Sequence, residues 1–259
     1  MEMHDYTALR LRFDDDIAHL QIYRPDANNA INEKLISEFT AALDLCDVRA
    51  KIVVVEGLPE VFCFGADFTE LQQGMDGDAA PHQDPQPMYA LWRRLATGPY
   101  VSIAHVRGKA NAGGIGFVAA CDIVLADTKA QFSLSELLFG LMPACVLPFL
   151  IRRIGFAKAN YMTLMTQPIS VQQAHEWGLV DAIEENSENL LRRNLLRLRR
   201  LNKTSIARYK RYMNSIEGSL DIAEHKALAA NREVFSDVDN LEKIARYVKT
   251  GQFPWEGFA

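Results

Sequence analysis

The order of apolar and polar residues predicts several β-strands in the first two thirds of the chain. Residues 9–13 and 17–23 alternate apolar and polar positions around an acidic turn, which is typical of a β-hairpin. Residues 52–55 form a short β-branched run that predicts a strand buried on both faces. Two further strands are expected at residues 101–105 and 122–125.

Helical spacing of apolar residues separates and follows these strands. It is clear at residues 31–45 and 88–95, and a polar segment at 73–87 is expected to form a loop. The last quarter of the chain is almost wholly helical in pattern. The sequence therefore predicts an α/β core over residues 1–194 and a helical region over 195–259.

Length and composition agree with a globular protein. A chain of 259 residues with 49% apolar and 24% charged residues favours one large domain and excludes global disorder. Its apolar runs are far shorter than the ~20 residues that span a bilayer, and it begins without a basic segment and apolar run. We therefore expect a cytoplasmic protein that does not enter membranes.

The charge is unevenly distributed. The net charge of −5 argues against a nucleic-acid partner. Residues 192–211, however, contain nine Lys or Arg and no acidic residue. This basic stretch is either a solvated helix face or a docking surface for an acidic partner.

Cysteine and histidine residues give no sign of a metal site. Six histidines are dispersed, and no cluster with carboxylates or cysteines has metal-ligand spacing. No CxxC pair is present, so we expect reduced core thiols at Cys46, Cys63, Cys121 and Cys145.

Two stretches rich in small residues follow β-rich runs, at 61–68 and 108–116. Small residues let a backbone approach a ligand closely, and free N–H groups at such turns attract negative charge. Neither stretch has the Lys-Ser/Thr of a phosphate-binding loop or the three glycines of a dinucleotide fingerprint. Taken alone, each is either tight packing or a ligand site.

Glu136 is a single carboxylate inside an apolar run at residues 131–143. A charge in such surroundings is costly unless it is paired, or unless its pKa rises so that it can exchange protons near neutral pH. Glu136 is therefore either a structural residue at a turn or a candidate acid–base group.

The order of these segments resembles the crotonase (enoyl-CoA hydratase/isomerase) superfamily over essentially the whole chain. The resemblance rests on short motifs in chain order, namely Arg24-Pro25, Asn28-Asn29-Ala30, Gly65-Ala66-Asp67, Gly113-Gly114, Cys121-Asp122, the Glu136 segment with Gly140 and Pro143, and Ala174 with Glu176-Trp177-Gly178-Leu179-Val180. It implies a spiral of ββα units with a C-terminal helical region that serves trimerisation and pantetheine entry. It also implies a homotrimer or hexamer and a thioester substrate.

The resemblance also assigns roles to residues. The backbone N–H groups of Ala66 and Gly113 correspond to an oxyanion hole that holds the thioester oxygen as it becomes an enolate. Phe64, Gly65 and Gly114 flank these positions and are expected to contact the substrate or its pantetheine arm.

One departure from the family pattern concerns the acid–base groups. Hydratases of the family usually place a first Glu three residues beyond the oxyanion glycine, where this chain has Gly116, and a second about twenty residues later, at Glu136. A single Glu136 can still remove the α-proton and return it to the departing hydroxyl, or shuttle it as isomerases do. Asp67 is the nearest candidate for a second acid, with a structural role as the alternative.

Further segments resemble one subgroup, the polyketide-biosynthesis enoyl-CoA hydratases of bacterial β-branching cassettes. These segments are residues 61–68, 107–114, 132–155, 161–166 and 250–256. The subgroup dehydrates 3-hydroxy-3-methylglutaryl held on an acyl carrier protein to the 3-methylglutaconyl thioester. The resemblance implies no cofactor beyond the phosphopantetheine of the carrier protein, or CoA. Rival functions are a double-bond isomerase, the decarboxylase of the same cassette, and a non-catalytic scaffold.

Binding roles for basic residues are predicted from this substrate. A cation should face its distal carboxylate, and Lys109 is the candidate, with a surface lysine as the alternative. Tyr209 and Lys210 are candidates for the phosphopantetheine phosphate. Arg199 and Arg200, in the basic stretch, are candidates for docking the acidic carrier protein.

Overall fold

A computed structural model describes residues 6–75 and 84–256. Its strands are β1 (Leu9–Asp14), β2 (Ile17–Ile22), β3 (Ile52–Glu56), β4 (Val61–Cys63), β5 (Val101–Val106), β6 (Lys109–Asn111), β7 (Ile123–Asp127), β8 (Gln131–Ser133), β9 (Ile169–Ser170) and β10 (Ala182–Glu184). Its α-helices are α1 (Glu33–Arg49), α2 (Phe68–Met75), α3 (Gln86–Thr97), α4 (Gly113–Ala120), α5 (Leu147–Ile154), α6 (Phe156–Met165), α7 (Val171–Glu176), α8 (Ser187–Leu198), α9 (Lys203–Glu217), α10 (Ser219–Ser236) and α11 (Val238–Thr250). Two 3-10 helices are η1 (Pro25–Ala27) and η2 (Glu136–Phe139).

Two sheets form the centre of the molecule. The six-stranded sheet has the order β1-β2-β3-β5-β7-β10, with an antiparallel hairpin at β1–β2 and parallel pairing elsewhere. The four-stranded sheet has the order β4-β6-β8-β9. Along the chain, β3 is followed by β4, β5 by β6 and β7 by β8. Each time, a strand of the first sheet is followed by a strand of the second and then by a helix. This repeated ββα step confirms the predicted α/β spiral.

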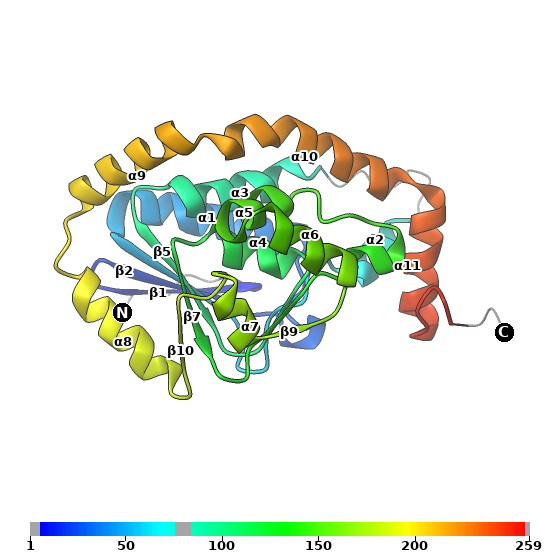
Figure 1. Cartoon of the computed structure of the whole chain (residues 1–259), viewed down its shortest axis with the longest axis horizontal. Coiled ribbons are helices and arrows are strands. Elements are labelled where there is room, and N and C mark those ends of the chain that lie inside the picture. The colour runs from blue at the N-terminus through cyan, green and yellow to red at the C-terminus, as the bar shows by residue number, and fades with distance from the viewer. Residues whose placement is uncertain (1–5, 76–83, 257–259) are drawn as a thin grey trace.

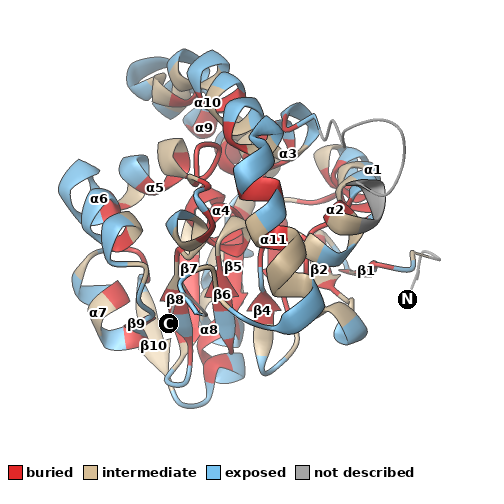
Figure 2. Ribbon diagram, turned by 90° about the vertical axis from the view of Figure 1, so that its right-hand side faces the viewer, coloured by how far each residue is buried: buried red, intermediate tan, exposed pale blue. Residues whose placement is uncertain are grey.

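The central strands of the larger sheet, β3, β5 and β7, are buried on both faces, as the unbroken apolar run of β3 predicts. In β3, Val53 and Val55 enter the main core, whereas Ile52 and Val54 face a second apolar cluster on the opposite side. In Figure 2 the central strands β5 and β7 are coloured largely as buried.

Helix α8 covers that second cluster. Its residues Leu190 and Leu191 pack there, with Leu195 and Leu198 partly buried against the same side chains. The predicted division at residue 195 therefore falls inside a helix that packs on the sheet. Helices α9 and α10 arch over the opposite side of the molecule and lead to α11, at the other end from α8 (Figure 1).

The predicted hairpin, the main strands and the long helices are confirmed. The loop expected at residues 73–87 lies largely outside the described residues, and α2 extends to Met75. The four cysteines are free and buried, as expected. Among the described helices, none has the length and apolar character needed to cross a membrane.

Candidate active site

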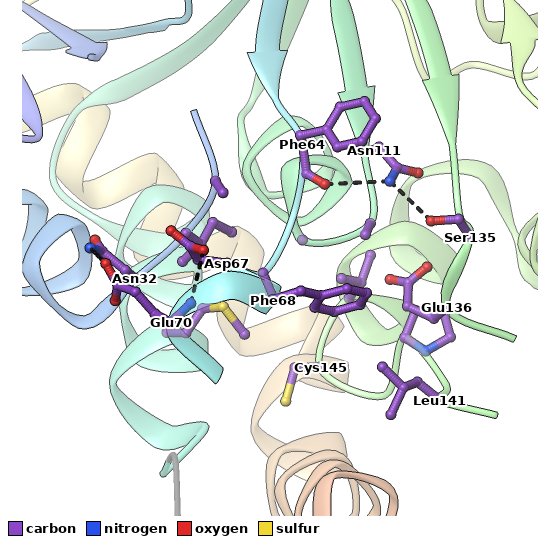
Figure 3. A pocket seen from close by; sticks show the side chains of 18 of the residues that line it. Asn32, Phe64, Asp67, Phe68, Glu70, Asn111, Ser135, Glu136, Leu141 and Cys145 are labelled. Atoms are coloured by element: carbon purple, nitrogen blue, oxygen red, sulfur yellow. Dashed lines mark hydrogen bonds between the residues drawn. The ribbon is translucent and has the colours of Figure 1, made fainter. Parts of the chain in front are cut away.

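A pocket of about 1560 Å³ opens among α1, α2, the first turn of α4, η2 and α11. Ala66, Gly113 and Glu136 all line it, and so do Phe64 and Asp67. The structure therefore brings together predicted site residues that lie up to about seventy positions apart in the sequence. Figure 3 shows part of this lining.

Small residues are required where the two stretches rich in small residues, 61–68 and 108–116, contact each other. Strands β4 and β6 pair in parallel, which places the turns that follow them side by side. A Cβ atom on Gly65 would lie 2.7 Å from Cβ of Ala112, and one on Gly114 would lie 2.3 Å from the carbonyl oxygen of Cys63. Gly65 also has a φ of +96°, which favours glycine. Gly65 and Gly114, expected to contact substrate, instead pack the two turns together.

Two backbone amides at this junction have no protein acceptor within the described residues. Ile31 N–H donates to Gly65 O (2.7 Å) and Asp67 N–H donates to Ile31 O (3.0 Å), so the N–H of Ala66 faces away from Ile31. Gly113 is the first residue of α4, where helical N–H groups lack partners. The position for a Cβ on Gly113 is 3.7 Å from Gly65 Cα. The two amides therefore lie close together at the pocket.

Glu136 begins η2, directly after the turn that follows β8. Its Oε2 is shielded from solvent and has no hydrogen-bond partner among the described protein groups. Burial raises the pKa of Glu136 to about 7, against the smaller lowering effect of its own N–H and that of Ser135. Figure 3 places the carboxylate beside the ring of Phe68, within the pocket. Glu136 is thus poised to exchange a proton near neutral pH.

Hydrogen bonds between polar side chains hold the segment that precedes Glu136 against β6. Asn111 donates to Ser135 Oγ (3.0 Å) and to Phe64 O (3.4 Å), and Ser133 Oγ donates to Asn111 Oδ1 (2.8 Å). Figure 3 shows the two bonds from Asn111. The contact between Asn111 and Ser135 could not be predicted from the sequence, because nothing in their spacing indicates that parallel pairing of β6 and β8 brings them together.

Asp67 lines the pocket but is engaged in structure. Its Oδ2 accepts from Arg24 (2.9 Å), and its Oδ1 accepts the N–H groups of Thr69 (3.1 Å) and Glu70 (3.2 Å) at the start of α2. With both oxygens occupied, Asp67 orients α2. The prediction that it could serve as a second acid is therefore not supported by its contacts.

The cation expected near a distal carboxylate is not supplied by Lys109. This residue is exposed at the start of β6 and is absent from the pocket lining. Arg24 is the cation that lines the described part of the pocket, and it is neutralised by Asp67 and by Glu70 (3.1 Å). The distal carboxylate of a substrate bound here would therefore either accept hydrogen bonds from neutral groups or lie at the solvent-exposed edge of the pocket.

The basic stretch does not reach the pocket within one chain. Lys210 is buried, with its ammonium 2.6 Å from Asp122 and 3.2 Å from Leu95 O, so the predicted phosphate contact is wrong for this residue. Tyr209 is exposed on α9 but is not part of the pocket lining. Arg199 and Arg200 follow α8, which lies at the opposite end of the molecule from α11 (Figure 1). The structure does not bring these residues to the candidate site.

Three polar residues outside the pocket lie close enough together in space to be considered as metal ligands. Single ligand atoms of Glu56, His105 and Glu188 lie within 4.8 Å of one another. Glu56, however, accepts from His105 (2.9 Å) and contacts His19 (3.3 Å), and these partners lower its pKa despite burial. Glu188 pairs with Arg107 (3.1 Å). Hydrogen bonds from the two histidines to Glu56, and the ion pair of Glu188 with Arg107, thus account for the group.

Trp92 explains why residue 116 is glycine. A Cβ on Gly116 would lie 2.4 Å from Cζ2 and 2.5 Å from Cε2 of Trp92, which is fully buried. The indole therefore fills the space next to residue 116, and no carboxylate fits there. Glu136 remains the carboxylate at the candidate reaction centre.

Comparison with known proteins identifies the class. The family model described as enoyl-CoA hydratase/isomerase matches residues 12–258. A 2,3-dehydroadipyl-CoA hydratase of Escherichia coli is 30% identical over 84% of both chains. The chain belongs to the enoyl-CoA hydratase/isomerase (crotonase) family and is a hydro-lyase.

Two further comparisons narrow this class. The bacillaene synthase dehydratase PksH of Bacillus subtilis is 56% identical over 99% of both chains. A crystal structure from the same organism, of an enoyl-CoA hydratase (pksH) assigned to polyketide biosynthesis, has a TM-score of 0.94 and 57% identity, covering 96% of this chain and 100% of that one. Within the family, the chain is therefore similar in kind to PksH-type hydratases/dehydratases, which these names place in polyketide biosynthesis.

Proposed function

We propose that the protein removes water from a 3-hydroxy-3-methylglutaryl thioester, held on an acyl carrier protein, to give the 3-methylglutaconyl thioester. The observation that carries this proposal is that Glu136, a carboxylate whose pKa is raised to about 7, lies in the same pocket as the unpartnered backbone amides of Ala66 and Gly113. Loss of water next to a thioester needs these two elements, a base for the α-proton and donors for the developing oxyanion.

The chemistry follows from the two elements. Ionised Glu136 takes the α-proton, and the C–H electron pair moves onto the thioester oxygen, which the N–H groups of Ala66 and Gly113 hold. The enolate then collapses, the C–O bond to the β-hydroxyl breaks, and Glu136 returns its proton to the departing oxygen. One carboxylate thus acts first as base and then as acid.

The proposal is tested by incubating the purified protein with the loaded carrier protein and weighing the intact carrier. We expect loss of one water. An unchanged mass would favour isomerisation or a non-catalytic scaffold, and loss of carbon dioxide would favour the decarboxylase of the same cassette. The raised pKa of Glu136 favours the catalytic alternatives over the scaffold. An unpaired buried carboxylate destabilises the fold, so a purely structural role does not explain it, whereas a proton-transfer role does.

We also propose that the protein assembles as a homotrimer or hexamer. Large apolar side chains stand exposed on α6, including Phe156 (70% exposed) and Leu164 (63% exposed). Exposed apolar groups concentrated on one helix are typical of protein contacts. Light scattering would measure the mass directly, and a monomer would overturn this part of the proposal.

Docking of the carrier protein is proposed on α11 rather than at the end of α8. Val248 and Gly251, at the end of α11, line the pocket, and exposed Lys249 lies between them. Lys249→Glu is expected to lower kcat/KM for carrier-bound substrate about three- to tenfold at low salt, because acidic carrier proteins are attracted by basic surfaces. Turnover of a pantetheine thioester should be unchanged.

Arg200→Glu is the matched control for this charge reversal. Arg200 is exposed, like Lys249, but it follows α8, which lies at the opposite end of the molecule from α11 (Figure 1). A larger effect of Arg200→Glu than of Lys249→Glu on the carrier-bound substrate would return the docking surface to the basic stretch.

A further inference from the structure

Asn111 lies between the two parts of the proposed reaction centre. It is the last residue of β6, and it lines the pocket although it is only 8% exposed. Figure 3 shows its side chain bonded on one side to Phe64 and on the other to Ser135. Phe64 is two residues before Ala66, and Ser135 is directly before Glu136. One side chain thus connects a turn that carries a proposed oxyanion donor with the segment that carries the base.

The contacts of Asn111 fix the orientation of its amide. Its Nδ2 lies 3.4 Å from Phe64 O, a carbonyl oxygen that can only accept. The same nitrogen also donates to Ser135 Oγ (3.0 Å), and Oδ1 accepts from Ser133 Oγ (2.8 Å). Turning the amide over would place two oxygens in contact at Phe64. The side chain is therefore held in a single orientation by three partners.

Ser135 precedes η2, at the position where a serine side chain commonly caps a helix by accepting a backbone N–H. It makes no such cap, and its Oγ accepts from Asn111 instead. Its own backbone N–H is one of the two donors that lower the pKa of Glu136 against the larger effect of burial. The orientation of the Ser135 peptide therefore affects where the Glu136 carboxylate lies and how strongly it holds a proton.

The bond from Asn111 to Ser135 continues an attachment that begins in the sheet. The paired residues of β6 and β8 end at Asn111 and Ser133, and the N–H of Ala112 donates to Ser133 O (3.0 Å). The bond to Ser135 Oγ extends this attachment two residues further, to the neighbour of Glu136. The placement of the base relative to β6 thus depends on a side-chain bond as well as on the sheet.

We propose that Asn111 is a positioning residue, which holds the Glu136 carboxylate at the distance from the amides of Ala66 and Gly113 that proton removal requires. That distance matters because the α-carbon is bonded to the carbonyl carbon whose oxygen these amides hold, and an error of about 1 Å can lower a rate about 100-fold. The inference rests on the enolate step of the proposed function. Asn111 transfers no proton itself, since its polar atoms are engaged with protein partners.

The kinetic test is Asn111→Ala, which removes the bonds to Phe64, Ser133 and Ser135. We expect kcat for water loss to fall about 10- to 100-fold and KM to change less than about threefold, because the base is displaced while most of the pocket wall remains. The midpoint of the pH dependence of kcat/KM should rise by about half a unit, since the Ser135 N–H is no longer held toward Glu136.

Ser102→Ala is the matched control for the loss of buried side-chain hydrogen bonds. Ser102 is fully buried in β5, its Oγ bonds Leu95 O (2.8 Å) and Asp122 (3.0 Å), and it is absent from the pocket lining. Denaturant unfolding should show a loss of stability in both variants. The kcat and the pH midpoint of Ser102→Ala should equal those of the unaltered protein.

A double-mutant cycle tests whether Asn111 acts through Ser135. Ser135→Ala, which removes only the hydroxyl, should lower kcat about tenfold. Combined with Asn111→Ala, it should lower kcat less than about threefold further, because the bond that it removes is already absent. Ser135→Ala also keeps the inference testable if Asn111→Ala does not fold.

Exchange of α-hydrogens with heavy water separates proton removal from water loss. The probe is 3-methylglutaryl pantetheine, which lacks the β-hydroxyl and cannot lose water. Its mass rises in D₂O each time the enolate forms and takes up deuterium. We expect Asn111→Ala and Ser135→Ala to slow this exchange about tenfold or more, because both displace the base.

The outcomes separate this inference from the proposed function. Three results would each overturn the role of Asn111 and leave the dehydration standing: unslowed exchange in both variants, effects that multiply in the double variant, or equal losses of kcat with equal pH midpoints in Asn111→Ala and Ser102→Ala. If the unaltered protein exchanges α-hydrogens in a way that depends on Asn111 but releases no water, the dehydration fails and the positioning role stands. An unaltered protein that neither exchanges nor releases water would overturn both.

Discussion

Glu136→Gln is expected to lower the rate of water loss by about 10³-fold or more, while the fold and assembly are retained. The amide has nearly the shape of the carboxyl group but cannot accept the α-proton. The measurement is single-turnover water loss from the loaded carrier protein. Asp67→Asn is the comparison, since Asp67 lines the same pocket and its oxygens bond Arg24 and α2. A turnover rate of Glu136→Gln close to that of the unaltered protein would remove Glu136 as the proton carrier.

The same variant should change how stability depends on pH. In the folded protein the pKa of Glu136 is raised from 4.5 to about 7, so the folded state holds this proton more tightly than the unfolded state. The stabilisation is complete below about pH 4.5 and is lost as the pH rises through 7.

Denaturant unfolding of the two proteins at pH 5 and pH 8 measures this effect. Relative to the unaltered protein, Glu136→Gln should gain up to about 3 kcal/mol in unfolding free energy as the pH rises, because one pKa unit is worth about 1.4 kcal/mol. A constant difference between the two proteins at all pH values would show that Glu136 titrates in its ordinary range.

Gly113→Pro is expected to reduce the rate of water loss about 10²- to 10³-fold, because it removes one of the two proposed oxyanion donors. Proline is tolerated at the first position of a helix, where Gly113 lies, so the substitution removes the donor without removing a hydrogen bond inside α4. Substrate binding should weaken less than the rate, since the oxyanion develops during the reaction.

Gly113→Ala is the matched control for side-chain bulk. Its added Cβ would meet Ile31 Cδ1 at 2.7 Å, the end of a side chain that can move, while its N–H remains. We expect Gly113→Ala to retain most of the activity. If both variants lose activity equally, packing at this turn rather than the lost donor accounts for the effect of proline.

Five strands of the larger sheet could be predicted because they are long enough to show a pattern, whereas its edge strand β10 has three residues and could not. The hairpin at β1–β2 alternates, and β3 is an unbroken β-branched run. The smaller sheet could not, because its strands have two or three residues, too few for any period to appear. The ββα repeat becomes visible when the strand order is known.

The site was predictable where the chemistry depends on local sequence. Glu136 is identified by its apolar neighbours, and its raised pKa agrees with them. The fate of Lys210 was not predictable, because its partner Asp122 lies 88 residues away and the helix pattern alone gives no sign of burial. The contact between Trp92 and Gly116 is hidden in the same way, since it joins α3 to α4 through tertiary packing.

The central claim is that one carboxylate, Glu136, carries the proton throughout the loss of water. The most direct test is the pH dependence of kcat/KM for water loss, measured by the mass of the carrier protein. We expect kcat/KM to rise with pH in a single step whose midpoint lies near 7, the pKa to which burial raises Glu136, and we expect no such activity in Glu136→Gln. A bell-shaped profile would contradict it by showing a second essential acid, and so would a carrier protein that loses no water at any pH.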